Sequence, residues 1–280
     1  MPGFEVDCKN VVFSPSGQPE LRILNGVDLK VAGGEFLGIV GANGTGKSTL
    51  LAAIAGELEL ADGKITVGGR SITGPINRRI DGVGIVHQND EDDLLHAYSI
   101  AMNVAFRQAN NGCHRGRFWA CSQKYRSWLA KEIADRAQTL RADVDQLVGH
   151  LSGGNRQILN LVISIHLEHE RNPCRLVLLD EHTARLDHEN AARVMTFTGQ
   201  QVKETRSTAI MVTHRYADAI EYCDRVVVMG EGKIKRVFAG DDMVRLRKCY
   251  QETRSTDELA VAVEDALTLD SGLSASHAAR

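Results

Sequence analysis

The eight residues from Gly41 to Ser48 constrain the fold more than any other stretch, because they read Gly-Ala-Asn-Gly-Thr-Gly-Lys-Ser. They match the pattern G-x-x-x-x-G-K-[ST] between a short apolar run, Phe36 to Val40, and a helix-like stretch, Thr49 to Leu58. A strand, a glycine-rich loop and a helix in that order are the setting in which this pattern binds phosphates. The motif therefore predicts a nucleotide-binding α/β domain, the alternative being a chance glycine-rich turn.

Each part of this phosphate loop has an expected task. The glycines let backbone N–H groups turn toward phosphate oxygens, and the next helix adds the positive end of its dipole. Lys47 is expected to contact the β- and γ-phosphates of ATP, and the Ser48 hydroxyl is expected to ligate Mg²⁺. The predicted nucleotide contacts are Gly41, Asn43, Gly44, Thr45, Gly46, Lys47, Ser48 and Thr49.

Apolar runs separated by helical stretches predict a parallel sheet wrapped by helices. After the run that precedes the phosphate loop, they lie at Val83 to Val86, Leu176 to Leu179, Ala209 to Val212 and Val226 to Met229. Strand patterns at Glu5 to Phe13 and Ile23 to Val31 predict an N-terminal antiparallel β subdomain. Lys233 to Phe238, after a Gly-Glu-Gly turn, predicts an edge hairpin.

The middle of the chain lacks strand-like runs. We expect an inserted α-helical lobe at about 99–160, with a helix near Trp128 to Arg141. Residues 1–254 are interpreted as one ATPase domain and 255–280 as a tail, in which Asp257 to Leu267 has a short helical pattern.

Composition excludes several classes of protein. Hydrophobic residues make up 43% of the 280 residues and the net charge is −3, which favours a sizeable core and gives no reason to expect nucleic acid as a partner. No stretch approaches the ~20 apolar residues that span a bilayer, and the polar start of the chain is unlike a secretory signal. The six cysteines are interpreted as reduced thiols, with Cys113, His114 and Cys121 as a weak alternative metal cluster.

Two carboxylates follow the apolar run Leu176 to Leu179. Asp180 and Glu181 then stand at the carboxyl end of a buried strand, where open α/β sheets bind ligands. Asp180 is expected to hold Mg²⁺, directly or through water, and Glu181 to polarise the attacking water. Such a pair alone is commonplace, and the nearby phosphate loop is what favours the catalytic interpretation.

The stretch Leu151 to Gln157 reads Leu-Ser-Gly-Gly-Asn-Arg-Gln. A serine and two glycines that open a helix make an anion site, although such a cap alone is weak evidence. This stretch closely resembles the signature of the ABC ATPases, and with the two nucleotide motifs the resemblance extends from about Val6 to Gly240. It implies a head-to-tail dimer of this chain, or a pair with another ABC ATPase subunit, in which Ser152, Gly153 and Gly154 act on ATP held by the other copy.

Further positions match the family. Gln88, after the strand Val83 to His87, resembles the family's Q-loop glutamine, which implies a contact with Mg²⁺ or the attacking water. His214, after the strand that begins at Ala209, resembles the switch histidine near the γ-phosphate. Ala184 to Asp187 resembles the D-loop at the dimer interface. The predicted catalytic residues are therefore Lys47, Gln88, Glu181 and His214, and the predicted metal contacts are Ser48, Gln88 and Asp180.

Three positions depart from the family pattern. The aromatic residue that stacks on adenine is usually Tyr, and the best candidate here is Phe13, although Phe4 blurs the register. His182 replaces a common Pro, and Arg185 stands where a small residue is common. None of these changes removes a catalytic group, so we expect an active ATPase.

The acidic run Asp90-Glu91-Asp92-Asp93 directly follows the Q-loop. It is interpreted either as a solvated loop or as an acidic contact for a basic helix of a membrane subunit. In the second case, reversing Asp92 and Asp93 to Lys should uncouple transport and leave the isolated ATPase intact.

A compact importer subunit fits the resemblance best, with integral membrane permease subunits as direct partners and a substrate-binding protein as an indirect one. The implied location is the cytoplasmic side of the cell membrane. Asp180 to Ala184 and the basic stretch His114 to Arg117 resemble a subgroup associated with tryptophan or tyrosine uptake. The alternatives are a non-transport ABC ATPase, for cofactor assembly or lipoprotein release, and a P-loop ATPase outside this superfamily.

Overall fold

Two β-sheets form the frame of the protein in a computed structural model that describes residues 2–72, 80–110, 122–137, 140, 143–167 and 174–253. The larger sheet has six strands in the order β10 (Lys233–Phe238), β9 (Arg225–Gly230), β3 (Phe36–Val40), β8 (Thr208–Val212), β7 (Leu176–Asp180) and β6 (Val83–Val86). Neighbours from β9 to β6 are parallel, and β10 is antiparallel at the edge. The predicted parallel core and edge hairpin are confirmed.

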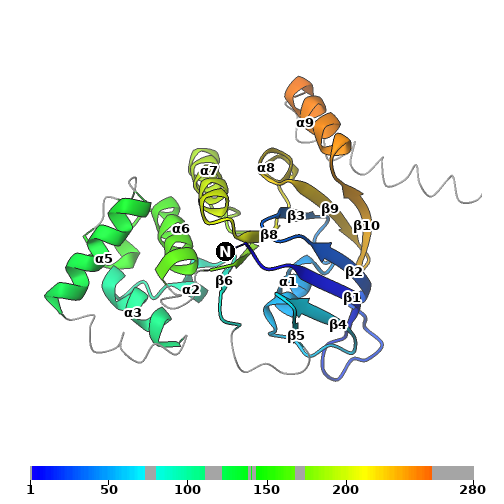
Figure 1. Cartoon of the computed structure of the whole chain (residues 1–280), viewed down its shortest axis with the longest axis horizontal. Helices are drawn as coiled ribbons and strands as arrows, with labels where there is room; N and C mark the ends of the chain where they lie inside the picture. The colour runs from blue at the N-terminus through cyan, green and yellow to red at the C-terminus, as the bar shows by residue number, and fades with distance from the viewer. Residues whose placement is uncertain are drawn as a thin grey trace, which may run out of the picture.

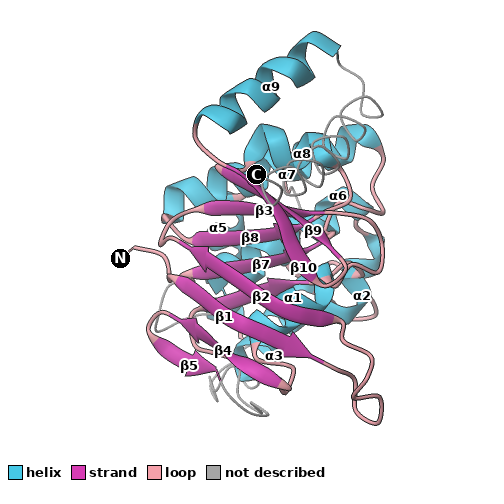
Figure 2. Ribbon diagram, turned by 90° about the vertical axis from the view of Figure 1, so that its right-hand side faces the viewer, coloured by secondary structure: helices cyan, strands magenta, loops and turns pink. Residues whose placement is uncertain are grey.

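The second sheet is antiparallel and contains β2 (Leu24–Val31), β1 (Val6–Phe13), β4 (Asp62–Val67) and β5 (Arg70–Ile72), in that order. Figure 2 shows this sheet beside the parallel one. The sequence interpretation found β1 and β2 but missed β4 and β5. Their signal is the alternation from Lys64 to Val67 followed by Gly68 and Gly69, which both have positive φ and form the turn.

Helix α1 (Lys47–Ala55) packs between the two sheets, against β4 on one side and β7 and β8 on the other. It begins within the phosphate-loop motif, two residues before the predicted helix, and ends at Gly56, whose φ of 78° terminates the helix in a left-handed cap. The buried side chains of α1 join the core cluster that both sheets share. The loop is therefore held between two rigid elements.

The helical lobe lies to one side of the sheets, at the left of Figure 1. Its described helices are α2 (Asp90–Asp93), α3 (Ile100–Asn110), α5 (Gln123–Arg136) and α6 (Gly153–Val162), with a 3₁₀ turn at Val148–His150 and a π-helical segment at Ile163–Leu167. The helix predicted near Trp128 begins five residues earlier, because the Ser122 hydroxyl caps it by accepting a hydrogen bond from the backbone N–H of Tyr125.

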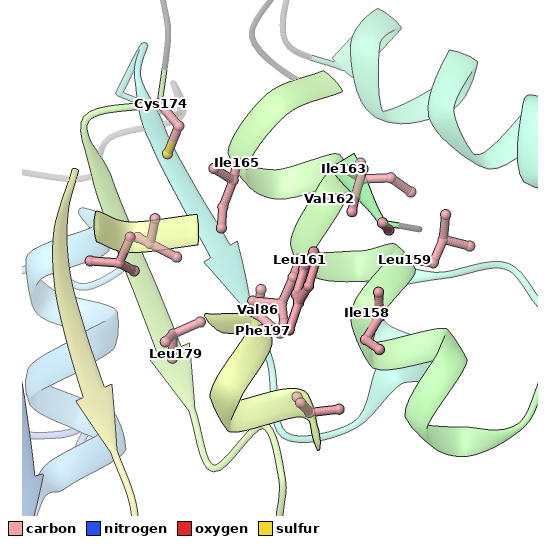
Figure 3. Close-up of a cluster of buried hydrophobic side chains, with 14 of the residues drawn as sticks. Val86, Ile158, Leu159, Leu161, Val162, Ile163, Ile165, Cys174, Leu179 and Phe197 are labelled. Carbon is pink, nitrogen blue, oxygen red and sulfur yellow. The ribbon is translucent and has the colours of Figure 1, made fainter. Parts of the chain in front are cut away.

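A hydrophobic seam joins this lobe to the parallel sheet. In Figure 3, side chains of α6 and of the π-helical segment, among them Leu161 and Ile165, face the strands that carry Val86 and Leu179. Phe197 of α7 (His188–Thr205) packs in the same region. One buried hydrophobic cluster contains Val86, Leu161, Ile165, Leu179 and Phe197. This packing fixes the start of α6 relative to the ends of β6 and β7.

Helices α8 (Tyr216–Tyr222) and α9 (Asp241–Thr253) complete the described chain. No helix of the described part is both long and apolar enough to cross a bilayer. Within the same residues, no group of three or more His, Cys, Asp or Glu side chains could hold a metal ion. The candidates Cys113, Cys121, His114 to Arg117 and the tail from residue 254 lie outside the described residues, so the boundary at 254 stays a prediction.

Candidate functional site

A pocket of ≈ 360 Å³ lies where the phosphate loop meets the ends of β6 and β7. It is lined by Asn43, Gly44, Gly46, Lys47, Ser48, Thr49, Gln88 and Glu181. All eight residues were predicted from the sequence to contact nucleotide, metal or water. The carboxyl ends of neighbouring parallel strands meet at one edge, which explains why residues more than a hundred positions apart share one pocket.

The loop conformation requires glycine at defined positions. Gly41 has a φ of 146°, and a Cβ atom there would lie 2.3 Å from the Met229 carbonyl oxygen. Gly46 has a φ of 96°, and its Cβ atom would lie 2.9 Å from the Ile23 carbonyl oxygen. Larger side chains would force the loop away from β9 and from Ile23, the residue before β2. These glycines therefore allow a loop shape that exposes backbone N–H groups to the pocket.

Lys47 is folded back over the loop. Its Nζ donates hydrogen bonds to the carbonyl oxygens of Gly41 and Ala42, each at 2.9 Å, and the residue is only 5% exposed. Burial lowers the Lys47 pKa, and the carboxylates of Glu181 and Asp180 partly oppose that shift. The ammonium is therefore held in place where an anion that enters the pocket would meet it.

Ser48, which lines the pocket, meets Asp180. The Ser48 hydroxyl donates to Asp180 Oδ1 at 2.9 Å. Burial raises the Asp180 pKa, the Ser48 hydrogen bond opposes this, and the neighbouring Glu181 charge adds to it. A half-buried carboxylate beside a hydroxyl is a donor set that fits Mg²⁺, which usually takes one or two protein oxygens together with phosphate and water oxygens.

Glu181 is the meeting point of three strand ends. Its Oε2 accepts a hydrogen bond from Gln88 Nε2 at 3.3 Å and lies 3.2 Å from Nδ1 of His214. Glu181 has a φ of 44°, a left-handed conformation that is unfavourable for a residue with a Cβ atom. The His214 side chain is 50% exposed. The structure thus brings Gln88, Glu181 and His214 together as the sequence predicted, although their roles stay predictions.

The signature residues stand apart from this pocket. Ser152 caps α6 by accepting from the backbone N–H of Asn155 at 3.4 Å. A Cβ atom on Gly154 would lie 2.7 Å from Oδ1 of Asn190, so α6 packs closely on α7 there. Ser152, Gly153 and Gly154 are not among the described residues that line the pocket. One copy of the chain therefore presents the two motifs on separate surfaces.

Phe13 lies at the end of β1 and is partly buried against the core cluster shared by the sheets. Its backbone carbonyl accepts from the N–H of Ile23, whose own carbonyl faces Gly46 of the phosphate loop. Phe13 is thus near the loop in the fold, although it does not line the pocket. Its role in adenine stacking stays a prediction.

The acidic run after Gln88 is not a solvated loop, which corrects one sequence interpretation. Residues Asp90–Asp93 form the one-turn helix α2. The Asp93 side chain is 1% exposed and accepts from the backbone N–H of His87 at 2.8 Å, from Asn160 Nδ2 at 2.7 Å and from Arg107 at 3.3 Å. Asp93 therefore joins the helical lobe to the end of β6 and is unavailable to a partner.

The Asp90 carboxylate also contacts other side chains of the same chain. Its Oδ2 forms an ion pair with Nε of Arg156, which follows the signature glycines, and lies 3.5 Å from Nε2 of His96. The neighbouring Asn89 accepts from Arg185 at 2.9 Å. The sequence interpretation missed these contacts, because it treated the acidic run as one unit and Arg185 only as a departure from the family.

His182, which replaces the common Pro, is buried at 1% exposure. Its Nε2 lies 3.2 Å from the Thr198 hydroxyl, which itself donates to the Val194 carbonyl at 2.9 Å. Because the hydroxyl has one hydrogen, it accepts from His182, so Nε2 carries the proton. Nδ1 is buried and has no partner among the described residues. Burial lowers the His182 pKa to about 4.

Comparison with known proteins finds relatives over most of the chain. The family model described as "ABC transporter" matches residues 24–184, which include the phosphate loop, the signature and the acidic pair. A tyrosine transport ATP-binding protein of Clostridioides difficile (strain R20291) is 32% identical over 222 residues, covering 79% of this chain and 85% of that protein. A methionine import ATP-binding protein of Salmonella choleraesuis (strain SC-B67) is 29% identical and covers 82% of this chain and 64% of that protein.

Solved structures give the same fold. A dimeric ATP-binding cassette in a post-hydrolysis state, bound to ADP and Pi, superposes with a TM-score of 0.68 at 25% identity. The match covers 83% of this chain and 97% of that chain. The similarity therefore extends over the antiparallel sheet, the parallel core and the helical lobe together.

Proposed function

The chain belongs to the ABC transporter family as an ATP-binding subunit with ATPase activity, and from this premise we propose that it powers import of a small molecule through a membrane permease. The observation that carries the proposal is the single pocket that gathers the phosphate loop, Gln88 and Glu181 beside the Ser48–Asp180 contact. Similarity to tyrosine transport and methionine import proteins supports an amino acid as the cargo.

Binding of ATP is assigned to the phosphate loop. Its backbone N–H groups and the N-terminus of α1 stabilise the triphosphate, and the Lys47 ammonium neutralises the β- and γ-phosphates. Lys47 is already oriented by two hydrogen bonds at 2.9 Å, so little side-chain entropy is lost when the nucleotide enters. Phe13 is proposed to stack on adenine through its half-buried ring.

Hydrolysis is assigned to the groups around Glu181. Its carboxylate accepts a proton from the attacking water, Gln88 orients that water, and His214 donates a hydrogen bond toward the γ-phosphate. Ser48, Asp180 and Gln88 would hold Mg²⁺, which when bound neutralises charge on the phosphate oxygens. Positioning and electrostatic stabilisation therefore account for most of the rate enhancement.

The separation of signature and pocket supports a composite site. We assign Ser152, Gly153 and Gly154 of one copy to the γ-phosphate bound by the other copy, through the N–H groups at the start of α6. A dimeric structural relative is consistent with this arrangement. Closure of two copies around ATP would then supply the mechanical step that drives the permease.

A surface next to the Q-loop suits a permease segment. Leu95, Tyr98 and Leu147 are 48%, 45% and 39% exposed, and backbone hydrogen bonds from Tyr98 to Leu95 and from Val148 to Tyr98 hold them close together. The exposed residues Glu91 and Asp92 precede this apolar patch in the chain, and Glu91 Oε1 lies 3.8 Å from Nδ1 of His96. We assign it to a cytoplasmic helix of the permease with apolar and basic residues, which would hold the chain at the cytoplasmic face of the membrane.

Two substitutions test the catalytic assignment. Lys47→Ala should weaken ATP binding, because it removes the cation that meets the phosphates. Glu181→Gln should retain ATP binding and lower kcat by about 100-fold or more, because only the proton acceptor is lost. Equilibrium binding of a fluorescent ATP analogue and steady-state phosphate release measure the two effects. Equal loss of binding in both variants would contradict these roles.

A further inference from the structure

Two loops are joined by two successive hydrogen bonds at the mouth of the pocket. Strands β6 and β7 are parallel neighbours, with Val86 paired to Leu179, so the loops that follow them run side by side. Gln88 donates to Glu181 at 3.3 Å. One residue further along, the side-chain oxygen of Asn89 accepts from the Arg185 guanidinium at 2.9 Å. The bond between Arg185 and Asn89 is the shorter of the two, and its donor, the guanidinium, carries a full positive charge.

The Asn89 side chain that binds Arg185 is also the N-cap of α2. The same oxygen accepts from the backbone N–H of Glu91 at 3.4 Å and so caps α2. Arg185 and the start of α2 therefore hold the same Asn89 oxygen, so the Arg185 bond adds to the restraint on the backbone at Asn89. The next residue, Asp90, is held by Arg156 of α6. The backbone on the carboxyl side of Gln88 is thus restrained by both lobes of the chain.

Gln88 itself is weakly held. Its only hydrogen bond among the described contacts is the 3.3 Å bond to Glu181, which is solvent-exposed. A glutamine side chain has three rotatable bonds, and a long, exposed hydrogen bond restrains them little. The position of its amide in the pocket thus depends on the backbone at Asn89, and that backbone is tied to the Glu181 loop by Arg185.

We propose that Arg185 is a positioning residue for hydrolysis, acting through Asn89 to keep the Gln88 amide beside Glu181. Arg185 does not line the pocket, so it is not expected to contact ATP. The inference rests on the proposed role of Gln88 and Glu181. A chain with a small residue at this position would lack the bond, so the departure from the family pattern has a specific consequence here.

The test uses the full-length chain and four variants. Arg185→Ala should lower kcat for ATP about three- to tenfold, the effect of one charge-assisted hydrogen bond, and leave the ATP KM unchanged. Asn89→Ser should give the same loss, because serine still caps α2 but is too short to reach Arg185. The double variant should be no slower than either single variant. Arg70→Ala, an exposed arginine on β5, should match the wild type.

The decisive comparison uses Gln88→Ala. In that background Arg185→Ala should have no further effect, because the group that it positions is gone, whereas a general structural defect would add its own loss. Wild-type kcat in Arg185→Ala, or an undiminished loss in the Gln88→Ala background, would overturn the proposal. A normal rate in Gln88→Ala itself would instead contradict the proposed function, so the two failures are distinguishable.

A second readout separates positioning from dimer formation. ATP-dependent dimerisation of Glu181→Gln should be unchanged when Arg185→Ala is added, since the proposed contact lies within one chain. Loss of dimerisation together with kcat would place the action of Arg185 at the interface and overturn the inference.

Discussion

At the residue scale, His182 shows how a departure from a family pattern can be accommodated. A buried imidazole directly follows the proposed base Glu181, whose φ of 44° must be maintained by its surroundings. The bond from His182 Nε2 to Thr198 anchors this turn to α7. The cost is a buried Nδ1 with no partner in the described part of the chain. Proline would rigidify the same turn through its ring rather than through a hydrogen bond.

This arrangement predicts a pH-dependent stability. The folded pKa of about 4 lies below the ordinary 6.5, so the unfolded chain binds a proton first as the pH falls. The free energy of unfolding should therefore decline from about pH 6.5 and level off near pH 4. The shift corresponds to about 3 kcal/mol. Urea denaturation of the metal-free chain across this range measures it.

The matched control is His182→Gln, whose side-chain amide can replace the Nε2 donor but does not titrate. It should retain stability near pH 7 and lack this part of the decline. An identical pH profile in both proteins would show that His182 does not remain neutral in the fold.

Contiguous motifs were predictable from the sequence at this scale, and long-range pairs were not. The phosphate loop, Asp180 and Glu181 lie in short patterns whose chemistry can be read directly. The bonds between Arg185 and Asn89 and between His182 and Thr198 join separate elements. Nothing in the local sequence of either partner specifies the other, so only the packing of β6, β7 and α7 reveals these pairs.

At the element scale, α2 differs most from its sequence interpretation. Its four acidic residues divide by helix geometry into two that are buried and two that are exposed. Asp90 and Asp93 face the chain and bind Arg156 and Arg107, whereas Glu91 and Asp92 face outward. Residues three apart lie on one helix face, so a single turn can join the lobes and also offer charge to a partner.

Asp93→Ala should destabilise the chain by about 3 kcal/mol or more, because it removes the carboxylate that pairs with the buried Arg107 guanidinium and also binds His87. Chemical denaturation at pH 7 measures the change. Asp92→Ala on the exposed side is the matched control and should lie within about 0.5 kcal/mol of the wild type. Similar values for the two variants would contradict the buried network.

The proposed permease contact now belongs to Glu91 and Asp92 rather than to Asp92 and Asp93. Reversing Glu91 and Asp92 to Lys should lower substrate transport in vesicles that contain the full transporter, because the docking charge is inverted. ATP hydrolysis by the isolated chain should be unchanged. Normal transport by this double variant would reject the acidic contact.

Elements with strong periodicity or apolar runs were predicted well, and those with weak patterns were not. Strand β3 and strand β6 match their predicted bounds because five and four consecutive residues are buried on both faces. Strands β4 and β5 are half exposed and short, so their pairing with β1 determines them more than their own composition does.

At the scale of the whole molecule, the sheets and the lobe place the pocket and the signature motif on separate surfaces. The α1 N-terminus opens into the pocket at one place, and the α6 N-terminus carries the signature at another. In the proposed composite site, each copy would supply one half-site for its own phosphate and one half-site for that of its partner. This geometry explains why a chain whose own pocket contains Lys47, Gln88 and Glu181 is still expected to act as a pair.

The most direct test of this composite site is the mass of Glu181→Gln in solution with ATP and a chelator of Mg²⁺, measured by analytical ultracentrifugation. A composite site predicts a dimer with ATP and a monomer without it. Adding Ser152→Asn, which keeps a good cap for α6 but crowds the partner's γ-phosphate, should restore the monomer. A Glu181→Gln chain that stays monomeric at saturating ATP, or a dimer that is indifferent to Ser152→Asn, would contradict it.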